Sequence, residues 1–368
     1  MLIPQKSYIY GMIKTVQKKI LWLCVFVTSF TYSQIPTYYD SIDFTQDSNS
    51  LRVDINTLLS NTLTNYVYYT SSSSTDVWDV VKISDLDPND TTNQNVLLVY
   101  GYDDADGLSE NDRTRNVNLS CHTSSCIGLW NREHVYPQSL GTYDADYPGI
   151  GTDVHNIRAC DSQMNSSRSN RIFEDGTGNA HITSSGNWYP GDEWKGDIAR
   201  ILMYMEILYP ANTWANQVGN SSNTYHTDMP DIFLQWNAED PVSDYEILRN
   251  EHIFSIQGNR NPFIDNPYIA TLIWGGPVAE DTWSTLSVAQ VSQLDAISVY
   301  PTLTNEYLYI TSDISHHFEY SIFDIIGKQL IHNTTNNNRV DVSNLSKGHY
   351  ILHLKDNNLI KTIRFYKY

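Results

Sequence analysis

Three residues near the middle of the chain have side chains suited to hydrolysing a phosphodiester bond. Glu133 and His134 are adjacent, and Asn165 follows the histidine by 31 residues. Histidine titrates near neutral pH, so His134 is a candidate to take a proton from an attacking water. The carboxylate of Glu133 and the amide oxygen of Asn165 are hard oxygen ligands, which suit Mg²⁺ bound with several waters and a phosphate oxygen. The three residues therefore predict a metal-assisted hydrolytic site.

Two arginines lie close in sequence to these candidates. Arg132 precedes Glu133, and Arg168 follows Asn165 by three positions. Guanidinium groups make charge-assisted hydrogen bonds to phosphate, so either arginine is a candidate to stabilise the phosphate or the departing group. The Glu133–His134 pair also sets a structural condition. Neighbours on a regular strand point to opposite faces, so both side chains reach one metal only at an irregular strand end.

A Glu-His pair has other interpretations. Alone, it is more typical of a surface histidine beside a carboxylate than of a catalytic site. A zinc protease is disfavoured because no HExxH motif occurs, and the pairs at 133–134 and 251–252 both run in the opposite order. The acidic run 103–107 resembles a calcium loop, but Tyr102 and Arg113 would then occupy its first and twelfth places. We interpret that run as an acidic surface loop.

Four cysteines are present, and Cys24 lies in an apolar N-terminal run. The other three are Cys121, Cys126 and Cys160, so one pair could close outside the cytosol. A bond from Cys121 to Cys126, or from Cys126 to Cys160, would brace the candidate site, which lies between Cys126 and Cys160. A zinc site at Cys121, His122 and Cys126 is the alternative, although it lacks compact CxxC pairing.

The elements that must position these residues follow from the spacing of apolar side chains. Apolar residues at helical spacing predict helices, and a run that is apolar on nearly all sides predicts a buried helix. Short β-branched apolar runs bounded by turn residues predict strands. The predicted helices cover 51–59, 194–209 and 245–253, and the predicted strands cover 77–81 and 95–100. This mixture indicates an α+β fold with a mixed α/β domain.

The character of the sequence changes towards the C-terminus. A polar stretch of small residues without clear periodicity predicts a linker at 278–295, after a larger domain at 34–277. Short runs of alternating apolar residues, separated by turns, then predict a small C-terminal β-sandwich at 296–368.

The overall composition favours two folded units but not a basic nucleic-acid-binding surface. The chain has 368 residues, 40% of them hydrophobic, and a formal net charge of −19. This charge opposes broad electrostatic attraction to nucleic acid, unless cations gather at the site or a divalent metal supplies positive charge. The simpler interpretation is that acidity keeps a secreted protein soluble.

The N-terminus has the pattern of an export signal. Lys18 and Lys19 precede the apolar run 20–27, and small and polar residues follow around Ser33. The apolar run is too short to span a bilayer. We therefore expect a signal peptide at 1–33, secretion or surface location, and no stable membrane insertion.

A series of ordered blocks strongly resembles the bacterial endonuclease I family, and the resemblance extends from about Leu51 to Pro267. The first block contains Asn131-Arg132-Glu133-His134 and a later one contains Asn165-Ser166-Ser167-Arg168-Ser169-Asn170. The blocks are 129–139, 152–156, 164–170, 195–200 and 257–263.

The resemblance implies a ββα-metal (His-Me finger) nuclease that cuts DNA, and often RNA, with little sequence preference. It makes His134 the general base, and Glu133 and Asn165 the ligands of a single Mg²⁺, with Mn²⁺ or Ca²⁺ as substitutes. It also implies an arginine that stabilises the cleaved phosphate, for which Arg168 is the first candidate and Arg132 the second.

Two further expectations accompany this resemblance. Asp153 and His155 match a block that would either support the metal site indirectly or make buried structural hydrogen bonds. The chain is more acidic and has fewer cysteines than the better-known periplasmic members. The acidity predicts weak, metal-assisted and salt-sensitive substrate binding.

The C-terminal region resembles the sorting domains of type IX secretion substrates. The blocks that carry this resemblance are Tyr300-Pro301, 324–328 and 342–350. It implies recognition by the type IX secretion machinery and export through the outer membrane. The alternative for this region is a small sandwich that binds polymers or proteins. For the whole protein, the alternative is a catalytically inactive surface binding protein or adhesin on a nuclease scaffold.

Overall fold

The computed structural model describes residues 35–123, 126–144, 148–283, 285, 297–312, 317–325, 327–335, 338–356 and 359–368. The expected signal peptide at 1–33 lies outside these residues. We call residues 35–283 the N-terminal body and residues 297–368 the C-terminal body, because each has its own hydrophobic core. Within the described residues, no helix combines the length and apolar character needed to cross a membrane.

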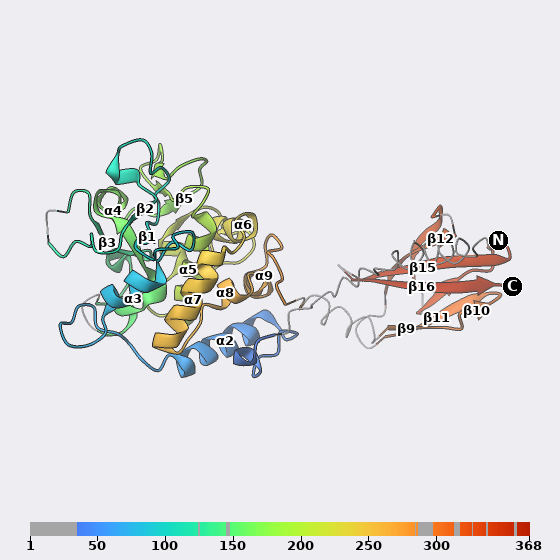
Figure 1. Cartoon of the computed structure of the whole chain (residues 1–368). Helices are drawn as coiled ribbons and strands as arrows, with labels where there is room; N and C mark the ends of the chain where they lie inside the picture. The colour runs from blue at the N-terminus through green and yellow to red at the C-terminus, as the bar shows by residue number, and fades with distance from the viewer. Residues whose placement is uncertain are drawn as a thin grey trace, which may run out of the picture. The chain divides into compact units, whose positions relative to one another are not determined.

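The N-terminal body combines helices with short strands (Figure 1). Its helices are α2 (Ser48–Thr62), α3 (Val77–Ser84), α4 (Ser162–Arg168), α5 (Lys195–Leu208), α6 (Asp231–Glu239), α7 (Asp244–Gln257), α8 (Pro262–Asp265) and α9 (Tyr268–Trp274). Its strands are β1 (Asn95–Leu97), β2 (Thr114–Asn116), β3 (Trp130–His134), β4 (Ile157–Asp161), β5 (Phe173–Glu174), β6 (His181–Ile182), β7 (Trp188–Tyr189) and β8 (Gly219–Asn220). The predicted α+β class is confirmed.

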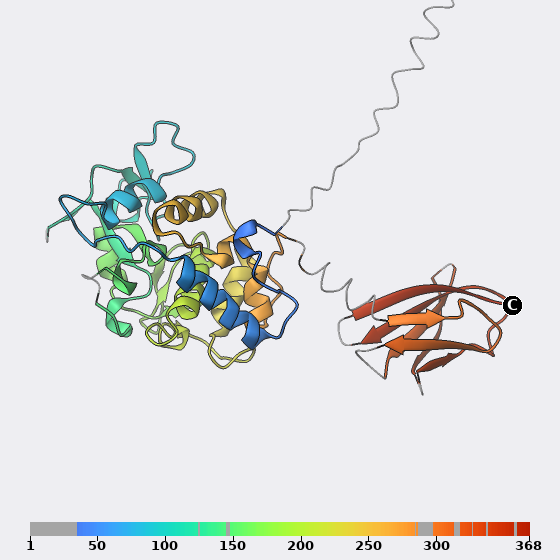
Figure 2. The same cartoon turned by 90° about the horizontal axis from the view of Figure 1, so that it is seen from below.

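The three predicted helices are present. In α2, Leu51, Ile55 and Leu59 recur every four residues and are all buried, which anchors the helix on the core. Helix α5 is buried at every position after Lys195, as expected for a run that is apolar on nearly all sides. Figure 2 shows α2 crossing the near side of the body, where it contacts α5 and α9.

The predicted strand at 77–81 is wrong, because these residues begin helix α3. Asp76 caps the helix, since its side chain accepts a hydrogen bond from Asp79 N while the Asp79 side chain accepts one from Asp76 N. The run is β-branched, but Val77, Val80 and Val81 fall on one buried face at helical spacing. Capping and helical burial therefore outweigh the β propensity of valine. The other predicted strand is present in shortened form as β1.

Strands β3 and β4 pair antiparallel, and helix α4 follows β4 directly. The register places Glu133 opposite Arg158 and His134 opposite Ile157. Asp161 ends β4 and caps α4 by accepting hydrogen bonds from Gln163 N and Met164 N. This unit is the ββα arrangement that the family resemblance implies.

The C-terminal body consists of two sheets around an apolar core, so the predicted β-sandwich is confirmed. One sheet has the order β10-β16-β15-β12-β13 and the other the order β14-β11-β9. Leu308 and Ile310 of the second sheet pack with Ile322 and Leu352 of the first. The strands are β9 (Ile297–Tyr300), β10 (Leu303–Thr304), β11 (Tyr307–Ser312), β12 (Glu319–Asp324), β13 (Gln329–Thr334), β14 (Arg339–Asp341), β15 (Gly348–Asp356) and β16 (Leu359–Lys367).

The first residues of the expected linker pack onto the N-terminal body. Trp283 is buried against the rings of Tyr39 and Phe44. The carbonyl of Glu280 accepts a hydrogen bond from Tyr268 N. These contacts extend the packed body beyond residue 277. Residues 286–295 of the expected linker lie outside the described residues.

Candidate active site

A cleft of about 390 Å³ opens where β3 ends. All five residues predicted for the site line this cleft, and they come from β3 and α4. The other lining residues belong to the segments that follow these two elements. The lining residues of the cleft are Arg132, Glu133, His134, Pro137, Gln138, Ser139, Asn165, Arg168, Ser169 and Asn170. Because β3 ends at His134, the alternation of a regular strand stops there, and both Glu133 and His134 line the cleft.

Glu133 is a buried carboxylate held by two neighbours. Its Oε1 accepts a hydrogen bond from the Tyr100 hydroxyl at 3.1 Å and lies 3.3 Å from Arg168 Nε. Burial raises the pKa of Glu133 to about 7, although Arg168 and Tyr100 both act to lower it. The two neighbours therefore do not fully compensate the negative charge of this group.

Arg168 is fixed by the protein on three sides. Besides the ion pair with Glu133, its two terminal nitrogens donate hydrogen bonds to the carbonyls of Val135, at 2.7 Å, and Ser169, at 3.0 Å. The side chain is only 1% exposed. This geometry joins the C-terminal end of α4 to the chain just after β3 and sets the position of the Glu133 carboxylate.

The imidazole of His134 is oriented by two contacts. Its Nε2 donates to the carbonyl of Gly151 at 2.8 Å, so in the neutral ring Nδ1 carries the lone pair. The ring of Tyr69 stacks on the imidazole with centroids 5.7 Å apart. Together these contacts fix both the tautomer and the tilt of the ring.

A buried polar network supports the segment that carries Gly151. Asp153 accepts hydrogen bonds from the hydroxyls of Tyr204 and Tyr209 and from the side chain of Gln257. His155 is fully buried, and burial lowers its pKa to about 4, so it is neutral near pH 7. Asp153 and His155 therefore make buried hydrogen bonds, and Asp153 lies two residues after Gly151, whose carbonyl binds His134.

Asn165 is held by its amide nitrogen. Nδ2 donates to Asn131 Oδ1 at 2.8 Å and to the Arg132 carbonyl at 3.2 Å, so Oδ1 is the atom turned away from β3. Among the described residues, no group donates a hydrogen bond to Asn165 Oδ1 or to Glu133 Oε2, and neither atom is a fully buried unpaired one. Each residue thus presents one oxygen that the protein leaves available to a cation.

These observations fit a hard, oxygen-ligated divalent cation better than a softer metal ion such as zinc or copper. The donors are one carboxylate and one amide oxygen, which are the ligands of Mg²⁺, Mn²⁺ and Ca²⁺. The described residues contain no cluster of three or more His, Cys, Asp or Glu that could hold a metal. The incompletely compensated charge of Glu133 is the chemical feature that a bound cation would balance.

Arg132 lies between two aromatic rings. Its guanidinium carbon is 3.5 Å from the ring centroid of Tyr69 and 4.1 Å from that of Trp78. One terminal nitrogen also donates hydrogen bonds to the Tyr69 carbonyl and to the Thr70 hydroxyl. Arg132 is therefore less buried than Arg168 but is held in one orientation at the edge of the cleft.

Cys121 and Cys126 form a disulfide, and Cys160 is a buried free thiol. Of the two pairings expected from the sequence, the shorter one is therefore present, and the zinc site is not. The two cysteines of the disulfide are hydrogen-bonded to β3 and α4. Cys121 N donates to the Trp130 carbonyl, and Ser162 Oγ donates to the Cys126 carbonyl.

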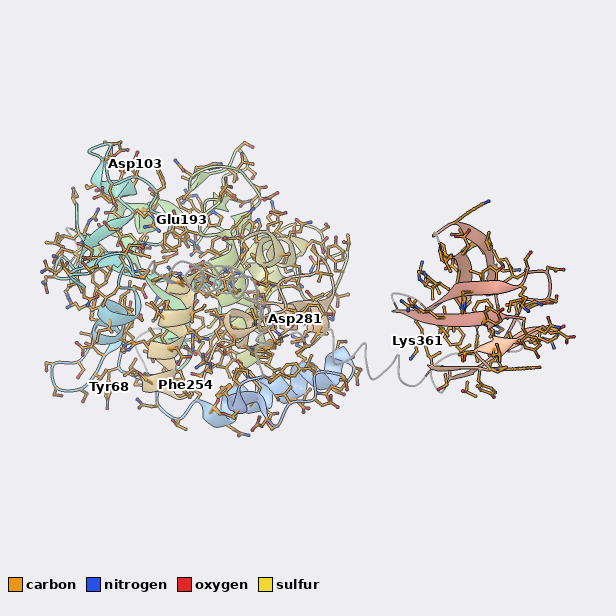
Figure 3. All side chains as sticks on the ribbon, turned by 45° about the vertical axis from the view of Figure 1, so that its right-hand side comes forward. Tyr68, Asp103, Glu193, Phe254, Asp281 and Lys361 are labelled. Carbon is orange, nitrogen blue, oxygen red and sulfur yellow. A yellow bond between two sulfur atoms is a disulfide. The ribbon has the colours of Figure 1, made fainter. Side chains whose placement is uncertain are left out.

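The acidic loop 103–107 uses its carboxylates to hold its own backbone. Asp104 accepts hydrogen bonds from Arg113 N and Thr114 N, and Asp106 accepts them from Leu108 N and the Asn111 side chain. Figure 3 labels Asp103 at the edge of the body. The interpretation as a surface loop agrees with these contacts.

Tyr69, Tyr100 and Gly151 belong to the site but were not identified from the sequence. Tyr100 ends an apolar run that predicts a strand, which gives no sign of its bond to Glu133. Gly151 contributes only its carbonyl, and Tyr69 stands 65 residues before His134. Their roles depend on contacts that spacing along the chain does not reveal.

Two family models and several known proteins are similar to parts of this chain. Residues 53–268 match the family model for endonuclease I, and residues 298–367 match the model for the secretion system C-terminal sorting domain. An extracellular ribonuclease of Bacillus subtilis is 36% identical over 256 residues, covering 66% of this chain and 80% of its own. An extracellular ribonuclease of Bacillus amyloliquefaciens is 37% identical over 219 residues, covering 56% and 70%. An extracellular deoxyribonuclease of Aeromonas hydrophila is 28% identical over 123 residues, covering 31% and 49%.

Proposed function

This chain belongs to the endonuclease I family, and from that premise we propose a metal-dependent hydrolysis of phosphodiester bonds in which His134 is the general base. The protein is a nuclease with a type IX sorting domain, and it is secreted or displayed at the cell surface. The observation that carries the finer proposal is the convergence of Glu133, His134, Asn165 and Arg168 on one cleft at the end of β3.

Glu133 and Asn165 are the residues that would hold the metal. Each presents an oxygen without a protein donor, and the amide nitrogen of Asn165 and Oε1 of Glu133 are fixed by neighbouring groups. When bound, a single Mg²⁺ supplies positive charge to the phosphate and to the developing alkoxide. The residues themselves contribute preorganisation, because neither side chain needs to reorganise to offer its oxygen.

His134 would move the proton. With Nε2 donating to the Gly151 carbonyl, Nδ1 accepts a proton from the attacking water, and the carbonyl stabilises the imidazolium that results. The stacked Tyr69 ring keeps the imidazole from rotating away from the cleft. Proton transfer of this kind contributes about 10²- to 10⁴-fold to a rate.

The two arginines take different roles in this proposal. Arg168 is a positioning residue, since its guanidinium contacts the Glu133 carboxylate and the backbone carbonyls of Val135 and Ser169. Arg132 lines the cleft, is more exposed and carries the charge that would face the phosphate. We therefore favour Arg132 over Arg168 for the phosphate contact.

We propose that both RNA and DNA are substrates. Two relatives that cover more than half of this chain are named ribonucleases, and a more distant one is named a deoxyribonuclease. The cleft is lined by groups that recognise phosphate and sugar, which predicts little sequence preference.

The proposed division of the chain is a signal peptide at 1–33, a nuclease domain that extends to about Trp283, a linker and a sorting domain from about 296.

The test is cleavage of supercoiled plasmid and of long RNA by the purified protein with Mg²⁺. We expect nicking and then degradation of the plasmid, degradation of the RNA, and loss of both with EDTA. His134→Ala is expected to lower the rate by about 10²-fold or more without lowering the melting temperature.

Two outcomes would contradict the proposal. Undiminished cleavage in EDTA would show that the reaction does not require a metal. Intact substrates with correctly folded protein would favour the alternative of a binding protein or adhesin on a nuclease scaffold.

A further inference from the structure

Three uncharged polar side chains line the cleft and have no part in the proposed hydrolysis. Gln138 and Ser139 come from the turn after β3, and Asn170 comes from the turn after α4. The two turns thus contribute to the same cleft as the candidate catalytic residues. Amide and hydroxyl groups bring no charge to a phosphate, but they can form hydrogen bonds with other polar groups of a substrate.

The turn after β3 is held in place by two tyrosines. Tyr136 is buried, and its hydroxyl donates to the Leu140 carbonyl at 3.3 Å. The hydroxyl of Tyr143 donates to the Tyr136 carbonyl at 2.6 Å. These bonds fix the chain on either side of Ser139, so its hydroxyl has a defined position at the cleft.

The turn after α4 contains a strained residue. Ser169 has φ 52° and ψ −130°, a left-handed conformation that residues with a side chain rarely adopt. Ser169 N donates to the Asn165 carbonyl at 2.8 Å, and the Ser169 carbonyl accepts from Arg168 at 3.0 Å. Strained backbone persists only where such contacts hold it, and it is common at binding sites. Here it turns the chain at the end of α4, and the next residue, Asn170, lines the cleft.

A hydrogen bond connects the two turns. Asn170 Nδ2 donates to Ser139 Oγ at 3.2 Å, so the proton of the Ser139 hydroxyl is directed elsewhere. Among the described residues, no protein group accepts that proton or donates to Asn170 Oδ1. Both side chains are exposed at the cleft. The pair therefore offers one hydrogen-bond donor and one acceptor, side by side, to a molecule in the cleft.

A neighbouring donor and acceptor complement a hydroxyl group, which donates and accepts at once. In a polynucleotide each phosphate is joined directly to two sugars, so groups that line the cleft beside the phosphate-binding residues meet a sugar before they meet a base. Within a strand, the free hydroxyl of ribose is the 2′-hydroxyl, and DNA lacks it. A site that binds this hydroxyl distinguishes RNA from DNA.

We propose that Ser139 and Asn170, which we call the ribose pair, bind the 2′-hydroxyl of a nucleotide next to the scissile phosphate. The 2′-hydroxyl donates to Asn170 Oδ1 and accepts from the Ser139 hydroxyl. The inference rests on the proposed function and deepens it, because it makes RNA the preferred substrate of a cleft that also cuts DNA. The 2′-hydroxyl acts only as a ligand, since water remains the nucleophile.

The first test uses a short DNA strand with a single ribonucleotide at its centre. Cleavage at the bonds beside the ribonucleotide is compared with cleavage at the other bonds of the same molecule, so the ratio does not depend on the amount of active enzyme. We expect a bond beside the ribonucleotide to be cut about fivefold to fiftyfold faster, as two additional hydrogen bonds at an open cleft would produce.

Alanine variants assign this preference to the ribose pair. Ser139→Ala and Asn170→Ala should each bring the ratio towards one without lowering the melting temperature, because both side chains are exposed. Ser167→Ala is the matched control and should keep the ratio, because Ser167 is an exposed serine of α4 that does not line the cleft. A ratio near one in the unmodified protein, or a ratio that both alanine variants retain, overturns the proposal. Products that end in a 2′,3′-cyclic phosphate also overturn it, because the 2′-hydroxyl would then be the nucleophile.

Binding measured without turnover separates this inference from the proposed function. In His134→Ala with Mg²⁺, fluorescence anisotropy gives Kd for ribose, 2′-deoxy and 2′-fluoro strands of one sequence. The ribose strand should bind most tightly. The 2′-fluoro strand, which favours the ribose pucker but cannot donate a hydrogen bond, should bind like DNA. Adding Asn170→Ala should remove the advantage of RNA, even if the unmodified protein proves inactive. Equal Kd values for ribose and deoxyribose strands, or a 2′-fluoro strand that binds like RNA, overturn the ribose pair.

Discussion

The N-terminal body buries many charged side chains, whereas the C-terminal body buries very few. Around β4, Arg158 lies between Asp85 and Asp197, and Arg249 bonds the second oxygen of Asp85. Elsewhere in this body Arg200 pairs with Glu246. In the described part of the C-terminal body, Lys367 is the buried charged residue, and the core is formed by apolar and aromatic side chains.

This difference reflects what each body has to do. Buried ion pairs contribute little net stability, because desolvation offsets their attraction, but they fix geometry. The ββα unit lies among these buried ion pairs, and the Glu133–Arg168 pair is one of them. The sandwich is a β-structure with an apolar core and an outer surface of alternating polar residues, for which burial of apolar area is sufficient.

The largest expected effect comes from breaking a buried ion pair. Arg200 makes two bonds to Glu246, at 2.6 and 2.8 Å, and both side chains are at most 2% exposed. Arg200→Ala leaves Glu246 charged and buried, which should lower the free energy of unfolding by about 3–5 kcal/mol. Scanning calorimetry measures the change. Lys355→Ala, which breaks the exposed pair with Glu319, should cost about 0–1 kcal/mol.

Equal destabilisation by the two variants would show that the two bodies do not differ in this way. The comparison becomes sharper with Arg200→Met combined with Glu246→Leu. This double variant removes both charges at once, so it should recover most of the stability that Arg200→Ala loses.

The next effect concerns the candidate metal ligand. Glu133→Gln keeps the shape of the side chain but removes the charge, so kcat should fall by about 10²-fold and the Mg²⁺ concentration for half-maximal rate should rise. Metal titrations of the cleavage rate measure both changes. Glu319→Gln in the sandwich is the control and should leave both unchanged. A loss of melting temperature that accounts for the loss of activity would make Glu133 a structural residue instead.

A smaller effect is expected from the hydroxyl that holds Glu133. Tyr100→Phe removes the 3.1 Å bond to the carboxylate, which should weaken metal activation by about tenfold, since a hydrogen bond to a charged group contributes about 1.5–3 kcal/mol. The same metal titration measures it. Tyr350→Phe removes the 2.8 Å bond to the Ser346 carbonyl and should change stability only. If both variants behaved alike, the Tyr100 hydroxyl would have no particular role at the site.

The fourth expected effect is a change in the pH dependence of stability. Burial raises the pKa of Glu206 from 4.5 to about 7, despite its contacts with Ala215 N and Arg52. The folded state then holds this proton more tightly than the unfolded chain does. The group's contribution to stability is therefore complete below pH about 4.5 and is lost as the pH rises through about 7.

Glu206→Gln removes this titration, so its free energy of unfolding should fall less between pH 5 and pH 8 than that of the unmodified protein. Urea unfolding at each pH measures the free energy. Glu306→Gln in the sandwich is the control variant and should follow the unmodified protein. A slope unchanged by Glu206→Gln would mean that this carboxyl titrates normally in the folded state.

Local patterns were enough to predict much of the fold. The four-residue spacing of Leu51, Ile55 and Leu59 predicted α2, and the continuous apolar run predicted the burial of α5. Alternation between turns predicted the sandwich. The run at 77–81 was predicted wrongly, because the capping contact between Asp76 and Asp79 depends on side-chain geometry and competes with the β propensity of valine.

Side-chain types and their order along the chain also identified which residues could do chemistry. Glu133, His134 and Asn165 are named by their side-chain chemistry and by the ordered blocks around them. Sequence could not choose between two cysteine pairings, nor between Arg132 and Arg168. Both choices depend on which groups the folded chain brings within bonding distance.

Tertiary structure decided how the site is held. The Gly151 carbonyl orients His134, the Tyr100 hydroxyl and Arg168 hold Glu133, and the Tyr69 ring lies against the imidazole. Those contacts join residues far apart along the chain. Hydrophobic periodicity encodes which face of an element is buried, but a single hydrogen bond or ring contact leaves no periodic trace, so only the folded chain reveals it.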